Sequence, residues 1–256
     1  MSTATPPVPA AEPSQPGLSE PSRLINAFIA PSKTFEDLKL NSSWWKPWLL
    51  SAVITLAFGI VAAQKIDFVR FMQQQIERSP SAQKRMEQMP PEQRERVISI
   101  QATGTKIAFY AYPVVILLGG ILFAAILMAI FNFMLGGQVP FGRAMAVVFY
   151  SFLPWNLSSI LLGISLLFSS DANSIDLSNP MPTNPAFFMD PQSSKFLYGL
   201  MKGVDVFAIW AVVLLGLGFA MASSNRRPSQ KTGIVTMFVI YGILVLLGAG
   251  WKAAFS

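Results

Sequence analysis

Pro154 and Asn156 stand close together in a long apolar segment, within the sequence YSFLPWN. Proline has no backbone N–H, and in a helix its ring clashes with the carbonyl four residues earlier, here that of Tyr150. We therefore expect a kinked helix in which the Tyr150 carbonyl loses its usual partner. Transporters use broken helices with polar groups at mid-membrane to bind solutes. We favour a simple kink, which membrane helices tolerate, because no charged residue accompanies Pro154.

Asp205 begins a later apolar segment, in the sequence KGVDVFAIW. An ionisable residue at a membrane span is a candidate functional residue by default. At the start of a helix, however, a carboxylate also interacts favourably with the helix dipole, and Lys202 lies three residues away. We expect Asp205 to anchor the helix start at the membrane interface rather than to catalyse a reaction or bind an ion.

No other residues suggest catalysis. The chain has no Cys and no His, which removes thiol nucleophiles, thiolate and imidazole metal ligands and imidazole general bases. Phosphate-binding and dinucleotide-binding glycine motifs are absent, and an intramembrane enzyme would need an acid pair that the apolar segments do not contain. We expect a non-enzymatic protein with no catalytic, cofactor-binding or metal-binding residues and no cofactor.

The composition is typical of an integral membrane protein. Of the 256 residues, 52% are apolar and 12% are charged, whereas soluble domains carry about 25% charged residues. The net charge of +6 does not indicate a nucleic-acid partner, because most Lys and Arg residues lie in loops beside apolar segments. We expect an all-α polytopic membrane protein that contacts the lipid bilayer with a bundle of five transmembrane helices. The expected spans are about residues 47–64, 109–135, 143–168, 204–222 and 232–252.

The N-terminal region has two parts. Residues 1–22 contain six prolines among Ala, Ser and Thr, which predicts a disordered Pro-rich tail before a membrane domain at residues 23–256. Apolar residues then recur at helical spacing up to Pro31, and a second short helix is expected over Thr34–Leu40 with Thr34 as its N-cap. These helices should be amphipathic. A further helix is expected to begin at Pro91 and to continue into the second span.

The short loops predict the orientation in the membrane. Arg226, Arg227 and Lys231 crowd the turn after the fourth span, which places the N-terminus in the cytoplasm and the C-terminus outside. The basic stretch at residues 65–106 favours the opposite orientation. We interpret the arginine pair as a topology anchor, with binding of anionic lipids as a second possibility.

Three sequence stretches resemble the Yip (Ypt/Rab-interacting protein) family of five-span membrane proteins, particularly its bacterial-type members. They are INAFIAPSKTFEDLK followed by WWKPWL, FYSFLPWNLSSIL in the third span, and NPMPTNPAFFMDPQSSKFLYGLMKGVDVFAIWAVVLLGLG. The last stretch has Asp205, Phe207 and Trp210 at its centre. The resemblance implies five helices, a cytoplasmic N-terminus, and a bacterial inner (plasma) membrane. Eukaryotic relatives are associated with small GTPases and vesicle formation, but the short Pro-rich tail and the large loop after the first span depart from them, so GTPase binding is not carried over.

The sequence leaves two functions open. We expect a membrane adaptor or organiser that acts through contacts with a partner membrane protein, with lipids or with a second copy of itself. Pro154, Asn156, Asp205 and Trp210 are the candidate residues, and the GxxxG spacing of Gly199 and Gly203 suits close helix packing. The alternative is a small channel or transporter with a site at the kinked third helix. A polar cavity shared by Ser151, Asn156 and Asp205 would favour transport.

Overall fold

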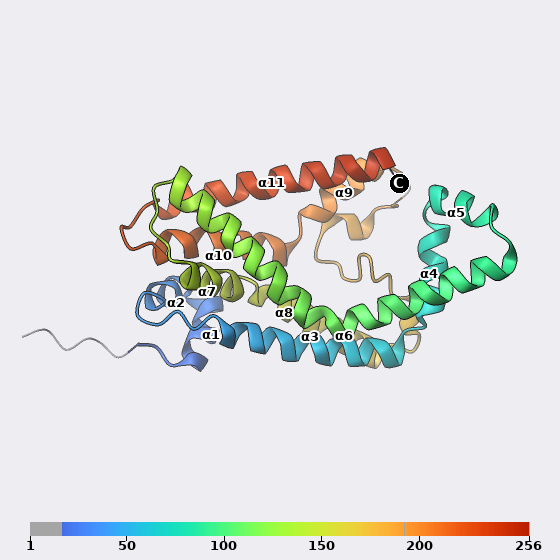
Figure 1. Ribbon diagram of the computed structural model, residues 1–256, viewed down its shortest axis with the longest axis horizontal. Helices are drawn as coiled ribbons and strands as arrows, with labels where there is room; N and C mark the ends of the chain where they lie inside the picture. The colour runs from blue at the N-terminus through green and yellow to red at the C-terminus, as the bar shows by residue number, and fades with distance from the viewer. Residues whose placement is uncertain (1–16, 192, 256) are drawn as a thin grey trace, which may run out of the picture.

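The chain folds as a bundle of helices, several of which run alongside one another for most of its length (Figure 1). The structure, a computed structural model, describes residues 17–191 and 193–255, and all regular elements within those ranges are helices. Residues 1–16 of the expected Pro-rich tail lie outside the described ranges.

The first helix, α1 (Glu20–Ile29), begins before the expected end of the tail. Its start is set by Ser19, whose side-chain oxygen accepts a hydrogen bond from the backbone N–H of Ser22 and so caps the helix. The chain leaves α1 at Ala30, directly before Pro31.

The second helix, α2 (Pro31–Asp37), begins earlier than expected. The assignment of Thr34 as its N-cap is wrong, because proline at the first helical position already fits the start of a helix. The hydroxyl of Thr34 instead donates a hydrogen bond to the backbone carbonyl of Arg23 at 2.9 Å, which ties α2 to α1.

After α2 the chain forms the first span, two short helices and the long helix of the second span. The span is α3 (Trp45–Lys65), and beyond it α4 (Phe68–Glu77) and α5 (Pro80–Glu87) extend from the bundle (Figure 1). The next helix, α6 (Pro91–Ala129), continues as a π-helical turn, η1 (Ile130–Met134). With 39 residues, α6 is roughly 58 Å long, so only part of it fits within a hydrocarbon core about 30 Å thick.

The third apolar segment forms two helices, α7 (Phe141–Ser151) and α8 (Leu153–Phe168). The long loop that follows contains two short 3₁₀ helices, η2 (Ala172–Ser174) and η3 (Pro185–Phe188).

The last three helices pack against one another. α9 (Lys195–Gly203) and α10 (Val206–Ala222) meet at a bend of 54°, and α11 (Gln230–Phe255) runs back along both. In the described ranges, α3, α6 with η1, α7 with α8, and α11 are each long and apolar enough to cross a membrane. The bent pair α9–α10 is a fifth candidate when it is counted as one span. These findings confirm the expectation of an all-α polytopic membrane protein.

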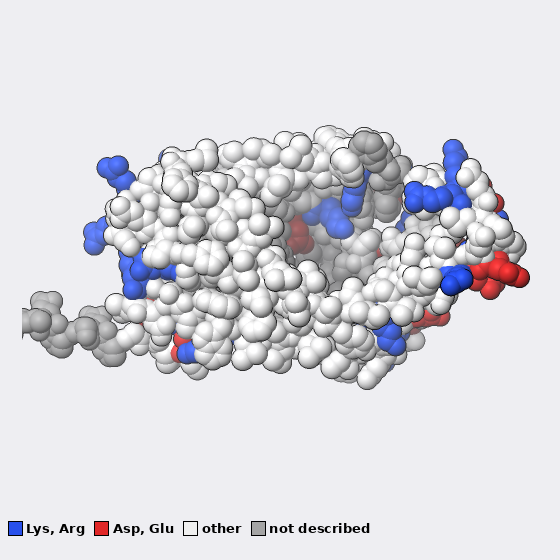
Figure 2. All heavy atoms as spheres, viewed as in Figure 1, with Lys and Arg blue, Asp and Glu red and all other residues white. Residues whose placement is uncertain are grey.

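Charged side chains gather toward the two ends of the molecule, and the face shown in Figure 2 has few of them between. One end holds α1, α2 and the turns that join α6 to α7 and α10 to α11, and we call it the α1 end (Figure 1). The opposite end holds α4, α5 and the loop after α8, and we call it the α4 end. A hollow between the ends has charged side chains on its floor (Figure 2).

Close contacts of α11 with α9 and α10 require glycine. A Cβ atom at Gly216 of α10 would lie 2.5 Å from the Cα of Ile234, and one at Gly203 would lie 2.5 Å from Cγ1 of Val245. The GxxxG spacing of Gly199 and Gly203 therefore lets α9 pack closely against α11 within one chain.

Substitution Gly216→Ala should lower the thermal midpoint of unfolding in detergent, because the new methyl group forces α10 and α11 apart. Overpacking of this kind costs about 1–3 kcal/mol. Gly248→Ala is the matched control, since a Cβ there meets no atom within 4 Å. Equal midpoints for the two variants would contradict this account of the α10–α11 contact.

Candidate functional site

The third span is interrupted for one residue next to Pro154, and Phe141–Phe168 still forms one candidate span. Phe152 separates α7 from α8 although its backbone stays in the right-handed helical region, and Pro154 lies in the first turn of α8. A first-turn proline needs no N–H donor, so the break removes the clash that was expected within a continuous helix. Pro154 offers the Tyr150 carbonyl no N–H, as expected, and the backbone N–H of Phe152 donates to it instead.

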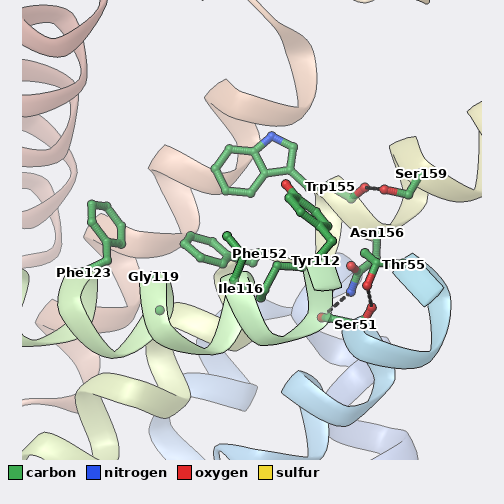
Figure 3. A pocket seen from close by; sticks show the side chains of 12 residues that line it. Ser51, Thr55, Tyr112, Ile116, Gly119, Phe123, Phe152, Trp155, Asn156 and Ser159 are labelled. Carbon is green, nitrogen blue, oxygen red and sulfur yellow. Dashed lines mark hydrogen bonds between the residues drawn. The ribbon is translucent and has the colours of Figure 1, made fainter. Parts of the chain in front are cut away.

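Asn156 joins α8 to the first span. Its side chain is buried, and Nδ2 donates a hydrogen bond to Oγ of Ser51 on α3 at 2.7 Å (Figure 3). The Ser51 hydroxyl donates in turn to the Pro47 carbonyl at 2.9 Å, and Thr55 donates to the Ser51 carbonyl at 2.7 Å. Asn156 therefore takes part in a polar contact between helices in the interior of the bundle.

A cavity of about 450 Å³ lies beside this contact, between α3, α6 and α8. Phe123, Phe152 and Trp155 are among the aromatic residues around it, and Asn156 lies at its side (Figure 3). A second cavity of about 350 Å³ adjoins it and is lined in part by Thr55, Tyr112 and Ser159, which also line the first. We call the two together the apolar hollow, because no charged residue lines either.

Asp205 lies at the start of α10, as expected. Its carboxylate accepts hydrogen bonds from the backbone N–H groups of Phe207 and Ala208, each at 3.0 Å, and from the hydroxyl of Thr183 in the long loop. The backbone N–H of Val206 donates to the Thr183 carbonyl at 3.0 Å. Asp205 thus caps α10 and fastens the loop to it.

Asp205 also faces a cavity of about 260 Å³, which we call the polar hollow. Lys202 and Tyr241 are among the residues that line it. Trp155 lines both the polar and the apolar hollow, so its indole stands at the boundary between them. Asn156 and Asp205 therefore face different cavities, and Ser151 lines neither of these cavities.

The remaining candidates lie apart from these hollows. Trp210 of α10 packs edge-to-face against Phe28 of α1, with ring centroids 5.4 Å apart. Two of the stretches that resemble the Yip family thus meet at this contact. Arg226 and Arg227 are exposed in the turn between α10 and α11.

A cluster of buried and partly buried charges at the α1 end was not identified from the sequence. Arg23 is 1% exposed, and its guanidinium bonds the Asp37 carboxylate through Nε. Oε1 of Glu20 lies 3.0 Å from Nη1 of Arg23 and 2.9 Å from Nζ of Lys46 on α3. Tyr150 of α7 donates its hydroxyl to Oε2 of Glu20 at 2.9 Å. We call these five residues the α1 clamp.

The clamp keeps Glu20 ionised. Burial raises the pKa of Glu20, but hydrogen bonds from Lys46, Ser43 and Tyr150 and the charge of Arg23 outweigh this, and the pKa is lowered overall. The alternation of acidic and basic residues around α1 and α2 is the only sequence signal for the clamp, and it does not distinguish buried pairs from solvated charges.

The fold and these buried polar contacts define a polytopic α-helical membrane protein whose spans are joined by internal hydrogen bonds. A family model described as the Yip1 domain matches residues 25–250, and the chain belongs to this family. The chain is also 24% identical over 233 residues to "Membrane protein YknW" of Bacillus subtilis (strain 168), with 89% of each chain covered. No solved structure matches the chain.

Substitution Asn156→Ala should lower the free energy of unfolding, because it removes the hydrogen bond between α8 and α3. Hydrogen bonds between membrane helices contribute about 0.6 kcal/mol on average and up to ~1.7 kcal/mol. Titration of the purified protein with a denaturing detergent measures the change. Ser159→Ala is the control, since the Ser159 hydroxyl bonds only its own helix, at the Trp155 carbonyl. Equal free energies of unfolding for the two variants would show that Asn156 does not stabilise the packing of α8 on α3.

Proposed function

We propose that this protein is a non-enzymatic membrane organiser, or adaptor, which holds a partner membrane protein or lipids against its helical bundle. One observation carries the proposal: the polar side chains in its spans are used to join its own elements. Asn156 bonds Ser51 of α3, and Asp205 bonds the start of α10 and the long loop. Such contacts stabilise a scaffold, whereas a solute pathway needs polar groups that converge on one cavity.

The proposal includes the absence of catalysis. It is supported by the lack of Cys and His in the sequence and by the separation of Asn156 from Asp205 in two cavities. In the described part of the chain, no group of three Asp or Glu residues lies close enough to hold a metal ion.

The surface that we assign to a partner is the outer face of α11. Of the four separate candidate spans, α11 has the smallest share of buried residues, 17% within its apolar 18-residue stretch. Its exposed apolar side chains include Ile243, Leu247 and Trp251. Lipid covers such a face when no partner is present, and a second apolar helix replaces that lipid at little cost, because both are equally apolar.

We further propose the bacterial inner (plasma) membrane as the location, with the N-terminus in the cytoplasm and the C-terminus outside. Arg226 and Arg227 support this orientation, since exposed basic residues beside spans favour the cytoplasm and contact anionic headgroups there. The similarity to a membrane protein of Bacillus subtilis supports a bacterial membrane.

A small transporter remains the second candidate function. The apolar hollow lies beside the break at Phe152, and Ser51, Asn156 and Ser159 supply it with polar groups. Asp205 does not line this cavity, so a solute bound there would be largely apolar.

Photo-crosslinking in native membranes tests the organiser function. A photoreactive residue at Ile243 of α11 should yield one discrete membrane-protein adduct or a dimer of this chain, and the same group at Leu118 of α6, also exposed, should yield lipid adducts alone. Lipid adducts alone at both positions would contradict the use of α11. Solute uptake by liposomes containing the protein, lost with Asn156→Leu, would favour the transporter.

A further inference from the structure

Lys202 is a charged residue within a candidate membrane span, in the last turn of α9. A charge within a membrane span is costly unless an opposite charge or a polar cavity receives it, which makes Lys202 a candidate for binding. Its ammonium group donates one hydrogen bond, to the Ser178 carbonyl. An ammonium group has three N–H donors, so two remain for another partner.

The nearby carboxylates are already bonded to other groups. Asp205 accepts from two backbone N–H groups and from Thr183, and Asp176 forms an ion pair with Arg78 at 2.7 Å. Among the described residues, no carboxylate lies within ion-pair distance of Lys202. Lys252 of α11 repels the Lys202 ammonium group, and Asp176 attracts it. Asp205 brings one negative charge to the polar hollow, and Arg78 balances the charge of Asp176. The two lysines therefore leave a net positive charge around Lys202, which favours an anion.

The surroundings of Lys202 identify the kind of anion. The polar hollow meets the apolar hollow at Trp155, so a charged site and an uncharged cavity share one wall. The 450 Å³ cavity lies in the size range of ligand pockets, which is about 300–1,000 Å³. Val115 and Trp155, which line it, are 55% and 40% exposed, so the cavity is open toward the bilayer.

We propose that this cavity pair binds one anionic phospholipid, with its phosphate at Lys202 and an acyl chain in the apolar hollow. An acyl chain gains little by leaving the bilayer for an apolar cavity, because both surroundings are hydrocarbon. Selectivity must therefore come from the headgroup. Both lipids carry the phosphate, but phosphatidylcholine also carries a quaternary ammonium group that the lysines repel, so phosphatidylglycerol should bind in preference to it. This inference deepens the organiser function and depends on it for its biological meaning.

Native mass spectrometry of the full chain, released from nanodiscs containing equal amounts of the two lipids, tests the site. The wild type should retain phosphatidylglycerol over phosphatidylcholine by about fivefold, the ratio that corresponds to ~1 kcal/mol per basic residue near a membrane surface. Lys202→Gln should bring the ratio close to one. Lys231→Gln, which removes an exposed lysine at the α1 end, should leave it unchanged. A wild-type ratio in Lys202→Gln would overturn the proposal.

A second variant tests whether the acyl chain occupies the apolar hollow. Gly119 lines the apolar hollow, and a Cβ there meets no atom within 4 Å, so Gly119→Leu fills the cavity without a clash at Cβ. It should reduce the amount of retained lipid, while Gly248→Leu on α11 should not. Displacement of the lipid by glycerol 3-phosphate would show a site for soluble phosphates and would also overturn the proposal. If lipid selectivity is absent but the α11 crosslink persists, the lipid site fails and the organiser function stands.

Discussion

Arg23 and Asp37 are the two charged residues that the described chain buries, and they are buried against each other where α1 meets α2. Removing one member of such a pair leaves an uncompensated charge and costs about 3–5 kcal/mol. The α1–α2 hairpin is therefore restricted to positions that keep the pair together. Glu20 extends the contact to Lys46 of α3 and Tyr150 of α7, so the α1 clamp joins the N-terminal helices to two spans.

Other packing contacts connect the spans beyond this cluster. Phe35 of α2 is fully buried, and its ring lies close to Gly218 of α10. The chain breaks at Phe152, two residues after Tyr150, and α8 then packs on α3 through Asn156. α6 packs on α3 and α7, whereas α11 packs on α9 and α10. The apolar hollow lies between α3, α6 and α8. The polar hollow lies where α8 and the long loop meet α9, α10 and α11.

The apolar helices and the position of Asp205 at a helix start could be predicted because they depend on local composition. A long apolar segment must form a helix in lipid, and a carboxylate before a helix accepts from its first N–H groups. The interruption beside Pro154 was predicted as a kink, but the sequence does not show where the neighbouring helices hold each half. The α1 clamp and the polar hollow could not be predicted. The clamp unites Glu20 with Tyr150, 130 residues later, and the hollow depends on which spans pack together.

A double-mutant cycle on Arg23 and Asp37 tests most directly whether the clamp holds the bundle together. The unfolding free energy in detergent would be measured for Arg23→Leu, Asp37→Leu and the double variant. We predict that each single variant loses about 3–5 kcal/mol and that the double variant loses less than either, because it leaves no unpaired charge. Losses that simply add would show that the two side chains act independently, and would contradict the account.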